Sequence, residues 1–71
     1  MEPQVAEALD AMRRQDWDAV QLLLHPYLHW TDGDGTLRGR TKVLAHLAGR
    51  PVPAEPTRCE LRDGQIYRWV G

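Results

Sequence analysis

The sequence predicts an α+β domain in which three helices pack on an antiparallel sheet made of two hairpins. Apolar residues recur at intervals of three and four in residues 4–14, 17–24 and 41–48, which is typical of amphipathic helices. Turn sequences at residues 32–35 and 63–64 each lie between β-prone segments, which indicates two hairpins.

The first two helices are expected to follow one another closely. The apolar side chains of the first lie on one side of it: Val5, Ala8, Leu9 and Met12. Asp16 is a suitable N-cap for the second, because its carboxylate can accept from free backbone N–H groups. Pro26 is expected to stop the second helix, since proline lacks the N–H that a helix needs.

A first hairpin and a third helix are expected next. In the symmetric register the cross-strand pairs of this hairpin are Thr31–Thr36, Trp30–Leu37 and His29–Arg38. Val43, Leu44 and Leu47 form the apolar side of the third helix, which ends with Gly49 as a left-handed C-cap. Three prolines then predict an extended crossover: Pro51, Pro53 and Pro56.

The second hairpin is predicted to have apolar side chains on both faces. With Asp63-Gly64 as a two-residue turn, the expected pairs are Arg62–Gln65, Leu61–Ile66, Glu60–Tyr67, Cys59–Arg68, Arg58–Trp69 and Thr57–Val70. Alternation then places an aliphatic set on one face: Leu61, Ile66, Cys59 and Val70. Tyr67 and Trp69 lie on the other face beside Arg58 and Glu60. We expect this second face to be a subunit interface in preference to a ligand surface, because Tyr, Trp and Arg are enriched at interfaces.

The composition favours a small cytoplasmic protein that gains stability by association. A chain of 71 residues forms one domain, residues 1–71, and buries only about 60% of the surface of its unfolded chain. Cys59 is the only cysteine, which excludes an intrachain disulfide. The net charge of −1 gives no reason to expect nucleic acid or a membrane as partner. The sequence has neither an apolar run of ~20 residues nor a signal peptide at its start, so we expect the cytoplasm.

Four segments resemble the nuclear transport factor two-like superfamily, also called SnoaL-like or ketosteroid-isomerase-like. They are residues 16–20 (DWDAV), 24–30 (LHPYLHW), 37–40 (LRGR) and 62–67 (RDGQIY). The resemblance implies a minimal cone-like fold, with a curved sheet wrapped on the helices, a pocket inside the cone and a homodimer formed through the outer sheet face. It also implies a short form of that fold, because the usual further pair of long strands is missing after the second hairpin.

The resemblance does not supply a catalytic residue. In the isomerases of this superfamily a carboxylate on the first long strand acts as general base, and the corresponding position here is Trp30, which cannot abstract a proton. If a second subunit completes a pocket, His29, Asp32 and Tyr67 are the candidates for proton transfer. Asp32 lies in a turn, where capping of backbone N–H groups is the ordinary role of an aspartate.

Neither a metal site nor a cofactor is expected. His25, His29 and His46 could be combined as zinc ligands, but each position has a structural explanation. Residues 32–35 lack the twelve-residue pattern of a calcium loop. Cys59 alternates with Leu61, so we expect a buried small hydrophobe and no nucleophile.

The sequence therefore predicts a dimeric ligand-binding or interaction module without autonomous catalysis. Its ligand-binding or interface residues are expected to be Trp30, Arg58, Tyr67 and Trp69, with a second copy or a small apolar molecule as the partner. One alternative is an enzyme of the isomerase, cyclase or hydratase type with a pocket completed by a second subunit. Another is a protein that docks on a longer relative by an exposed edge strand.

Overall fold

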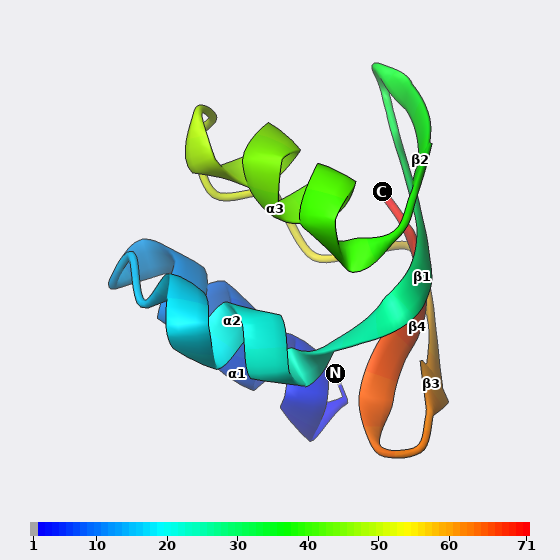
Figure 1. Ribbon diagram of the computed structural model, residues 1–71, viewed down its shortest axis with the longest axis horizontal. Coiled ribbons are helices and arrows are strands. Elements are labelled where there is room, and N and C mark those ends of the chain that lie inside the picture. The colour runs from blue at the N-terminus through cyan, green and yellow to red at the C-terminus, as the bar shows by residue number, and fades with distance from the viewer. Residues whose placement is uncertain (1) are drawn as a thin grey trace.

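The computed structural model describes residues 2–71, which form three helices and four strands (Figure 1). The elements are α1 (Pro3–Arg13), α2 (Trp17–Leu23), β1 (Leu24–Asp32), β2 (Gly35–Arg38), α3 (Arg40–Ala48), β3 (Arg58–Arg62) and β4 (Gln65–Val70). The predicted α+β class and the three helices are confirmed. No helix within these residues has both the length and the apolar character needed to cross a bilayer.

The helix ends follow from local chemistry with two departures from expectation. Asp16 caps α2 as predicted, since its Oδ1 accepts from the backbone N–H of Ala19 at 3.2 Å. However, α2 ends at Leu23, and Leu24 already has extended backbone angles at the start of β1. Gly49 follows α3 with a φ of −98°, so the predicted left-handed cap is wrong. The backbone N–H of Arg50 instead donates to the carbonyl of Leu47 at 3.2 Å, and this turn needs no positive φ.

The sheet is mixed, which corrects the predicted antiparallel arrangement. Its strand order is β2-β1-β4-β3, and the central pair, β1 with β4, is parallel. Both hairpins form as expected, but α3 and the proline-rich segment after it carry the chain to the far edge of the sheet, where β3 lies. The return strand β4 is therefore inserted beside β1 in the same direction.

The two hairpins differ in how well their register was predicted. In the first, all three expected pairs are present, including Trp30 with Leu37. In the second, the two pairs next to the turn are correct, but the register shifts between Leu61 and Glu60, and Glu60 lies opposite Arg68. The expected pairs Glu60–Tyr67, Cys59–Arg68, Arg58–Trp69 and Thr57–Val70 are wrong, because Tyr67 is an extra residue in β4.

This β-bulge turns Trp69 to the opposite face from the one predicted. Trp69 lies opposite Cys59 and Trp30, on the face that the helices cover, and it is only 1% exposed. Its ring stacks on that of Trp30, with centroids 4.7 Å apart and planes inclined by 12°. The predicted position of Trp69 beside Tyr67 on an exposed face is therefore wrong.

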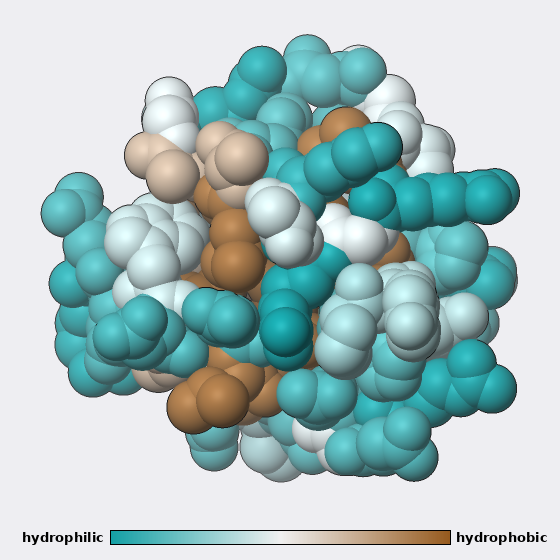
Figure 2. Space-filling model, in the orientation of Figure 1, coloured by the Kyte–Doolittle hydropathy of each residue, from teal (hydrophilic) through white to brown (hydrophobic). Residues whose placement is uncertain are grey.

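All three helices pack on one face of the sheet, which we call the inner face, and the opposite face is the outer face (Figure 1). Across the four strands the inner face has a continuous row of side chains: Leu37, Trp30, Trp69 and Cys59. Helix residues complete the core over this row: Val5, Ala8, Leu9, Ala11, Met12, Val20, Val43 and Leu47. Figure 2 shows a mostly hydrophilic surface in this view, with a narrow hydrophobic band near its middle.

Candidate functional site

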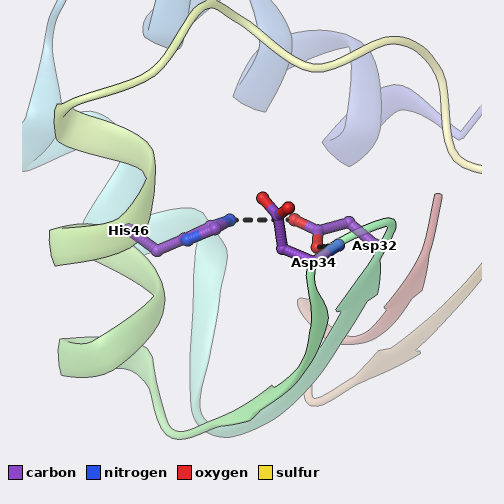
Figure 3. Close-up of side chains that lie close together, drawn as sticks. All are labelled: Asp32, Asp34 and His46. Atoms are coloured by element: carbon purple, nitrogen blue, oxygen red, sulfur yellow. Dashed lines mark hydrogen bonds and ion pairs between the residues drawn. The ribbon is translucent and has the colours of Figure 1, made fainter.

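Asp32, Asp34 and His46 come together at the end of the sheet beside α3 (Figure 3). Asp32 is the last residue of β1, Asp34 lies in the turn before β2, and His46 projects from α3. His46 Nε2 lies 2.8 Å from Asp32 Oδ2. Because an ionised carboxylate can only accept, Nε2 is the protonated nitrogen of this imidazole.

The Asp32 carboxylate is held by two further donors. The indole Nε1 of Trp30 donates to the same Oδ2 at 3.0 Å, which alternation allows because residues two apart in a strand share a face. The backbone N–H of Asp34 donates to Oδ1 at 2.8 Å. This last bond is the local turn contact that the sequence predicted for Asp32.

These donors keep Asp32 ionised. The hydrogen bond from the Trp30 indole is the main reason why the pKa of Asp32 falls from 3.8 to about 2, and the Asp34 N–H and His46 lower it further against the opposing effect of partial burial. A carboxylate with so low a pKa is a weak general base at neutral pH. Asp32 is therefore suited to orient His46 and not to abstract a proton itself.

The same three side chains offer the donor types of a mixed oxygen and nitrogen metal site. Their ligand atoms lie within 4.8 Å of one another. The contacts present are nevertheless structural. The Arg50 guanidinium pairs with Asp34, and three N–H groups point at Asp32. We call Asp32, Asp34, His46 and Arg50 the clasp, because they join the β1–β2 turn to α3 and to the residue that follows its C-cap. A cation would have to displace both Arg50 and the proton of His46.

A shallow depression of about 130 Å³ adjoins this clasp. It is lined by Asp32, Asp34, Gly35, Thr36, Leu37, His46 and Arg50. With Asp32 fixing the proton on Nε2, Nδ1 is the basic nitrogen of His46. The arrangement can therefore accept a proton from a small molecule bound in the depression, if such a molecule reaches Nδ1.

A second group of side chains lies on the outer face, around Tyr67. The ring of Tyr67 makes T-shaped contacts with the rings of His25 and His29, with centroid distances of 5.0 and 5.4 Å. The Arg62 guanidinium lies 4.9 Å from the centre of the Tyr67 ring, in cation–π contact. Tyr67 lies on the face that alternation from Ile66 predicts, and the β-bulge after it changes only the later residues, so that Arg68 joins the outer face while Trp69 enters the core.

The outer face also has a polar row that crosses all four strands. In strand order the row is Arg38, His29, Arg68 and Glu60. Arg68 Nε lies 3.6 Å from Glu60 Oε2, whereas Arg38 makes no ion pair within residues 2–71. Beside Arg38 a shallow depression of about 330 Å³ is lined by Tyr27, His29, Arg38 and Gly39. Tyr27 is 74% exposed, so this part of the sheet has an aromatic ring in contact with solvent.

The residues predicted for the site are thus divided among three places. His29 and Tyr67 lie together on the outer face, and Arg58 lies on the same face opposite Val70. Trp30 and Trp69 lie in the core. Asp32 is on the inner side with His46, so His29, Asp32 and Tyr67 do not converge on one point.

The histidines do not assemble as a metal site either. His46 faces Asp32, while His25 and His29 contact Tyr67 on the other side of the sheet. The sequence reasoning missed His46 as the partner of Asp32. The available signal was its position directly before Leu47, which places His46 at the border of the apolar stripe of α3.

Cys59 lies half-buried on the inner face, close to the start of α1. Burial is the largest cause of a raised thiol pKa, and the carboxylates of Glu2 and Glu60 raise it further. A thiol with a raised pKa is a poor nucleophile at neutral pH, but the full burial expected for Cys59 is not observed.

Comparison of the chain with models of protein families, with curated proteins and with solved structures found no match in any of the three.

Proposed function

We propose that this protein is a dimeric binding module that pairs through its outer sheet face and has no catalytic activity of its own. The observation that carries this proposal is the one-sided cover of the sheet: among residues 2–71 the three helices all lie on the inner face, and no helix lies on the outer face (Figure 1). A cytoplasmic location remains the prediction from the sequence.

The filled interior supports a surface role over an internal pocket. Trp30 and Trp69 stack at the centre of the inner face, and each is only 1% exposed. The resemblance to SnoaL-like proteins implies a ligand inside the cone, but in this chain two indole rings occupy the middle of that space. The outer face instead presents Tyr27, His29 and Tyr67 with several arginines, which are residue types common at interfaces.

The size of the domain gives a physical reason for pairing. A domain of about 70 residues buries too little apolar surface for large stability by itself, and association is one of the usual remedies. A second subunit on the outer face would cover Tyr27, which is among the most exposed large hydrophobic side chains of the described residues.

Light scattering across a dilution series, with the melting temperature recorded at each concentration, tests the proposal. A dimer whose melting temperature falls on dilution is expected. Tyr27→Ser should weaken it, whereas Leu22→Ser is a matched control, because Leu22 is also 74% exposed but lies in α2. A wild-type mass of one chain at every concentration would contradict the proposed dimer. If Leu22→Ser weakened the dimer as much as Tyr27→Ser, the assignment of the interface to the outer face would be contradicted.

The Asp32–His46 pair favours a second candidate, an enzyme of the isomerase, cyclase or hydratase type, whose pocket a second subunit would complete at the end of the sheet beside α3 and not on the outer face. Here His46 would be the proton acceptor and Asp32 its positioning residue. A thermal-shift screen of small apolar carbonyl compounds, run on the wild type and on His46→Gln, tests this function. A compound that stabilises only the wild type favours it, and equal stabilisation of both proteins opposes it.

A further inference from the structure

We infer that the outer face binds a second copy of this chain about a twofold axis parallel to the strands, with Arg38 of each copy facing Glu60 of the partner subunit. This inference rests on the proposed dimer and specifies its geometry. It follows from the order of charges along one row of side chains.

The row has opposite charges at its two ends. Arg38 lies on edge strand β2 and Glu60 on edge strand β3, with His29 and Arg68 between them. All four belong to one face, because residues directly opposite each other in neighbouring strands point the same way. The ends are separated by three strand spacings, or roughly 14 Å.

A twofold axis parallel to the strands, midway between β1 and β4, reverses the row. Strand β2 of one copy then lies over β3 of the other, so that Arg38 faces Glu60 of the partner subunit at both ends of the interface. The central residues also match, since a neutral His29 can accept a hydrogen bond from Arg68 of the partner subunit. Sheets stacked face to face lie about 10 Å apart, a gap that an arginine and a glutamate can span together.

A twofold axis perpendicular to the strands, lying along this row, is disfavoured by charge. An axis along the row keeps the order of the strands, so Arg38 would face Arg38 of the partner subunit and Glu60 would face its own copy. Like charges in direct opposition strongly weaken an interface. Of these two axes, the charge pattern favours the one parallel to the strands.

Two neighbouring features agree with this geometry. The depression lined by Tyr27, His29 and Arg38 is open on the outer face and can receive the Glu60 carboxylate of the partner subunit. The next row on the same face has the order Thr36, Thr31, Val70 and Arg58. The same axis places Arg58 over Thr36 of the partner subunit, and no like charges meet in this row.

Charge reversal at each end of the row tests the arrangement. Arg38→Glu and Glu60→Arg should each weaken self-association by about tenfold or more, because each variant opposes two like charges at both contacts. An equimolar mixture of the two variants should dimerise, since every contact then joins opposite charges. The double variant R38E/E60R should also dimerise. Lys42→Glu in α3 and Glu7→Arg in α1 are controls that make the same charge changes at exposed positions away from the outer face.

Mass is measured by sedimentation velocity at several concentrations, with far-UV circular dichroism to confirm folding. A monomeric wild type overturns the proposed dimer. A dimeric wild type whose single variants keep their association, or whose variant mixture does not associate, overturns the twofold arrangement and leaves the dimer intact. Loss of association in each single variant together with its recovery in the mixture supports the inference, since misfolding cannot produce that recovery.

Discussion

Trp30 Nε1 donates a hydrogen bond of 3.0 Å to Asp32 Oδ2, two residues further along the same strand. This bond joins the centre of the core to the surface turn, because the Trp30 ring also stacks on Trp69 and Asp32 also binds His46. The packing of the core and the ionisation of the Asp32 carboxylate are therefore linked through the side chain of Trp30.

Replacement of Asp32 by asparagine should lower the free energy of unfolding by about 1–2 kcal/mol at pH 7, because hydrogen bonds to a charged acceptor are worth more than those to a neutral one. Urea denaturation measures the change. Asp34→Asn is the matched control and should have a smaller effect, since Asp34 is exposed and pairs only with an exposed arginine. If Asp34→Asn lowered the free energy of unfolding as much as Asp32→Asn does, the hydrogen bonds to the Asp32 carboxylate would not explain the loss of stability.

The low pKa of Asp32 also predicts an acid dependence of stability. The pKa is about 2 in the folded protein against 3.8 for the free group, so the contribution of Asp32 is fully present above pH 4 and is lost as the pH falls towards 2. The difference in unfolding free energy between the wild type and Asp32→Asn should therefore shrink over that interval. Denaturation at a series of pH values checks this, and a constant difference from pH 5 to pH 2 would count against it.

Trp69→Ala is expected to cost about 3–5 kcal/mol, as other large-to-small changes of buried aromatic residues do. In so small a domain this loss is enough to unfold most of the protein. Trp30→Ala should behave alike, and each change should remove the near-UV circular dichroism signal of the stacked indoles. Trp17→Ala is the control, because Trp17 is only partly buried at the edge of the core. A folded Trp69→Ala protein that had lost only its dimer would restore the sequence-based placement on the outer face.

Gly39→Ala should destabilise the protein by about 1–2 kcal/mol, because Gly39 has a φ of +94° at the start of α3 and a side chain is strained there. No atom obstructs the added methyl group, so the cost is conformational. Gly33→Ala provides the comparison, since Gly33 has equal space but no positive φ. Thermal denaturation of the two variants measures the difference in stability between them. Equal melting temperatures would rule out the conformational explanation.

The local features of the fold were predictable from the sequence, whereas the pairing of distant strands was not. The Asp16 cap and the register of the first hairpin depend on residues within a few positions of one another. The β-bulge at Tyr67 could not be predicted from the alternation of apolar and polar residues. Apolar residues lie on both sides of Tyr67 in the sequence, so the register with the bulge and the register without it each bury some of them. Nothing near β1 or β4 in the sequence encodes their parallel pairing.

The candidate site shows the same division. The turn role of Asp32 was predictable from its neighbours, but its partner His46 is fourteen residues away on a helix whose position depends on the whole sheet. Likewise, the outer row of Arg38, His29, Arg68 and Glu60 exists only once the strand order is known. Alternation within single hairpins could not reveal it.

The parallel pairing of β1 with β4 also predicts an order of folding. Each hairpin can close early from its own turn, but the central pair joins segments about forty residues apart, such as Trp30 with Trp69. The sheet and the tryptophan stack can therefore form only once residues 65–70 have been synthesised. Until then β1 remains an exposed edge, and the slow step of folding is expected to be the docking of the second hairpin on the first.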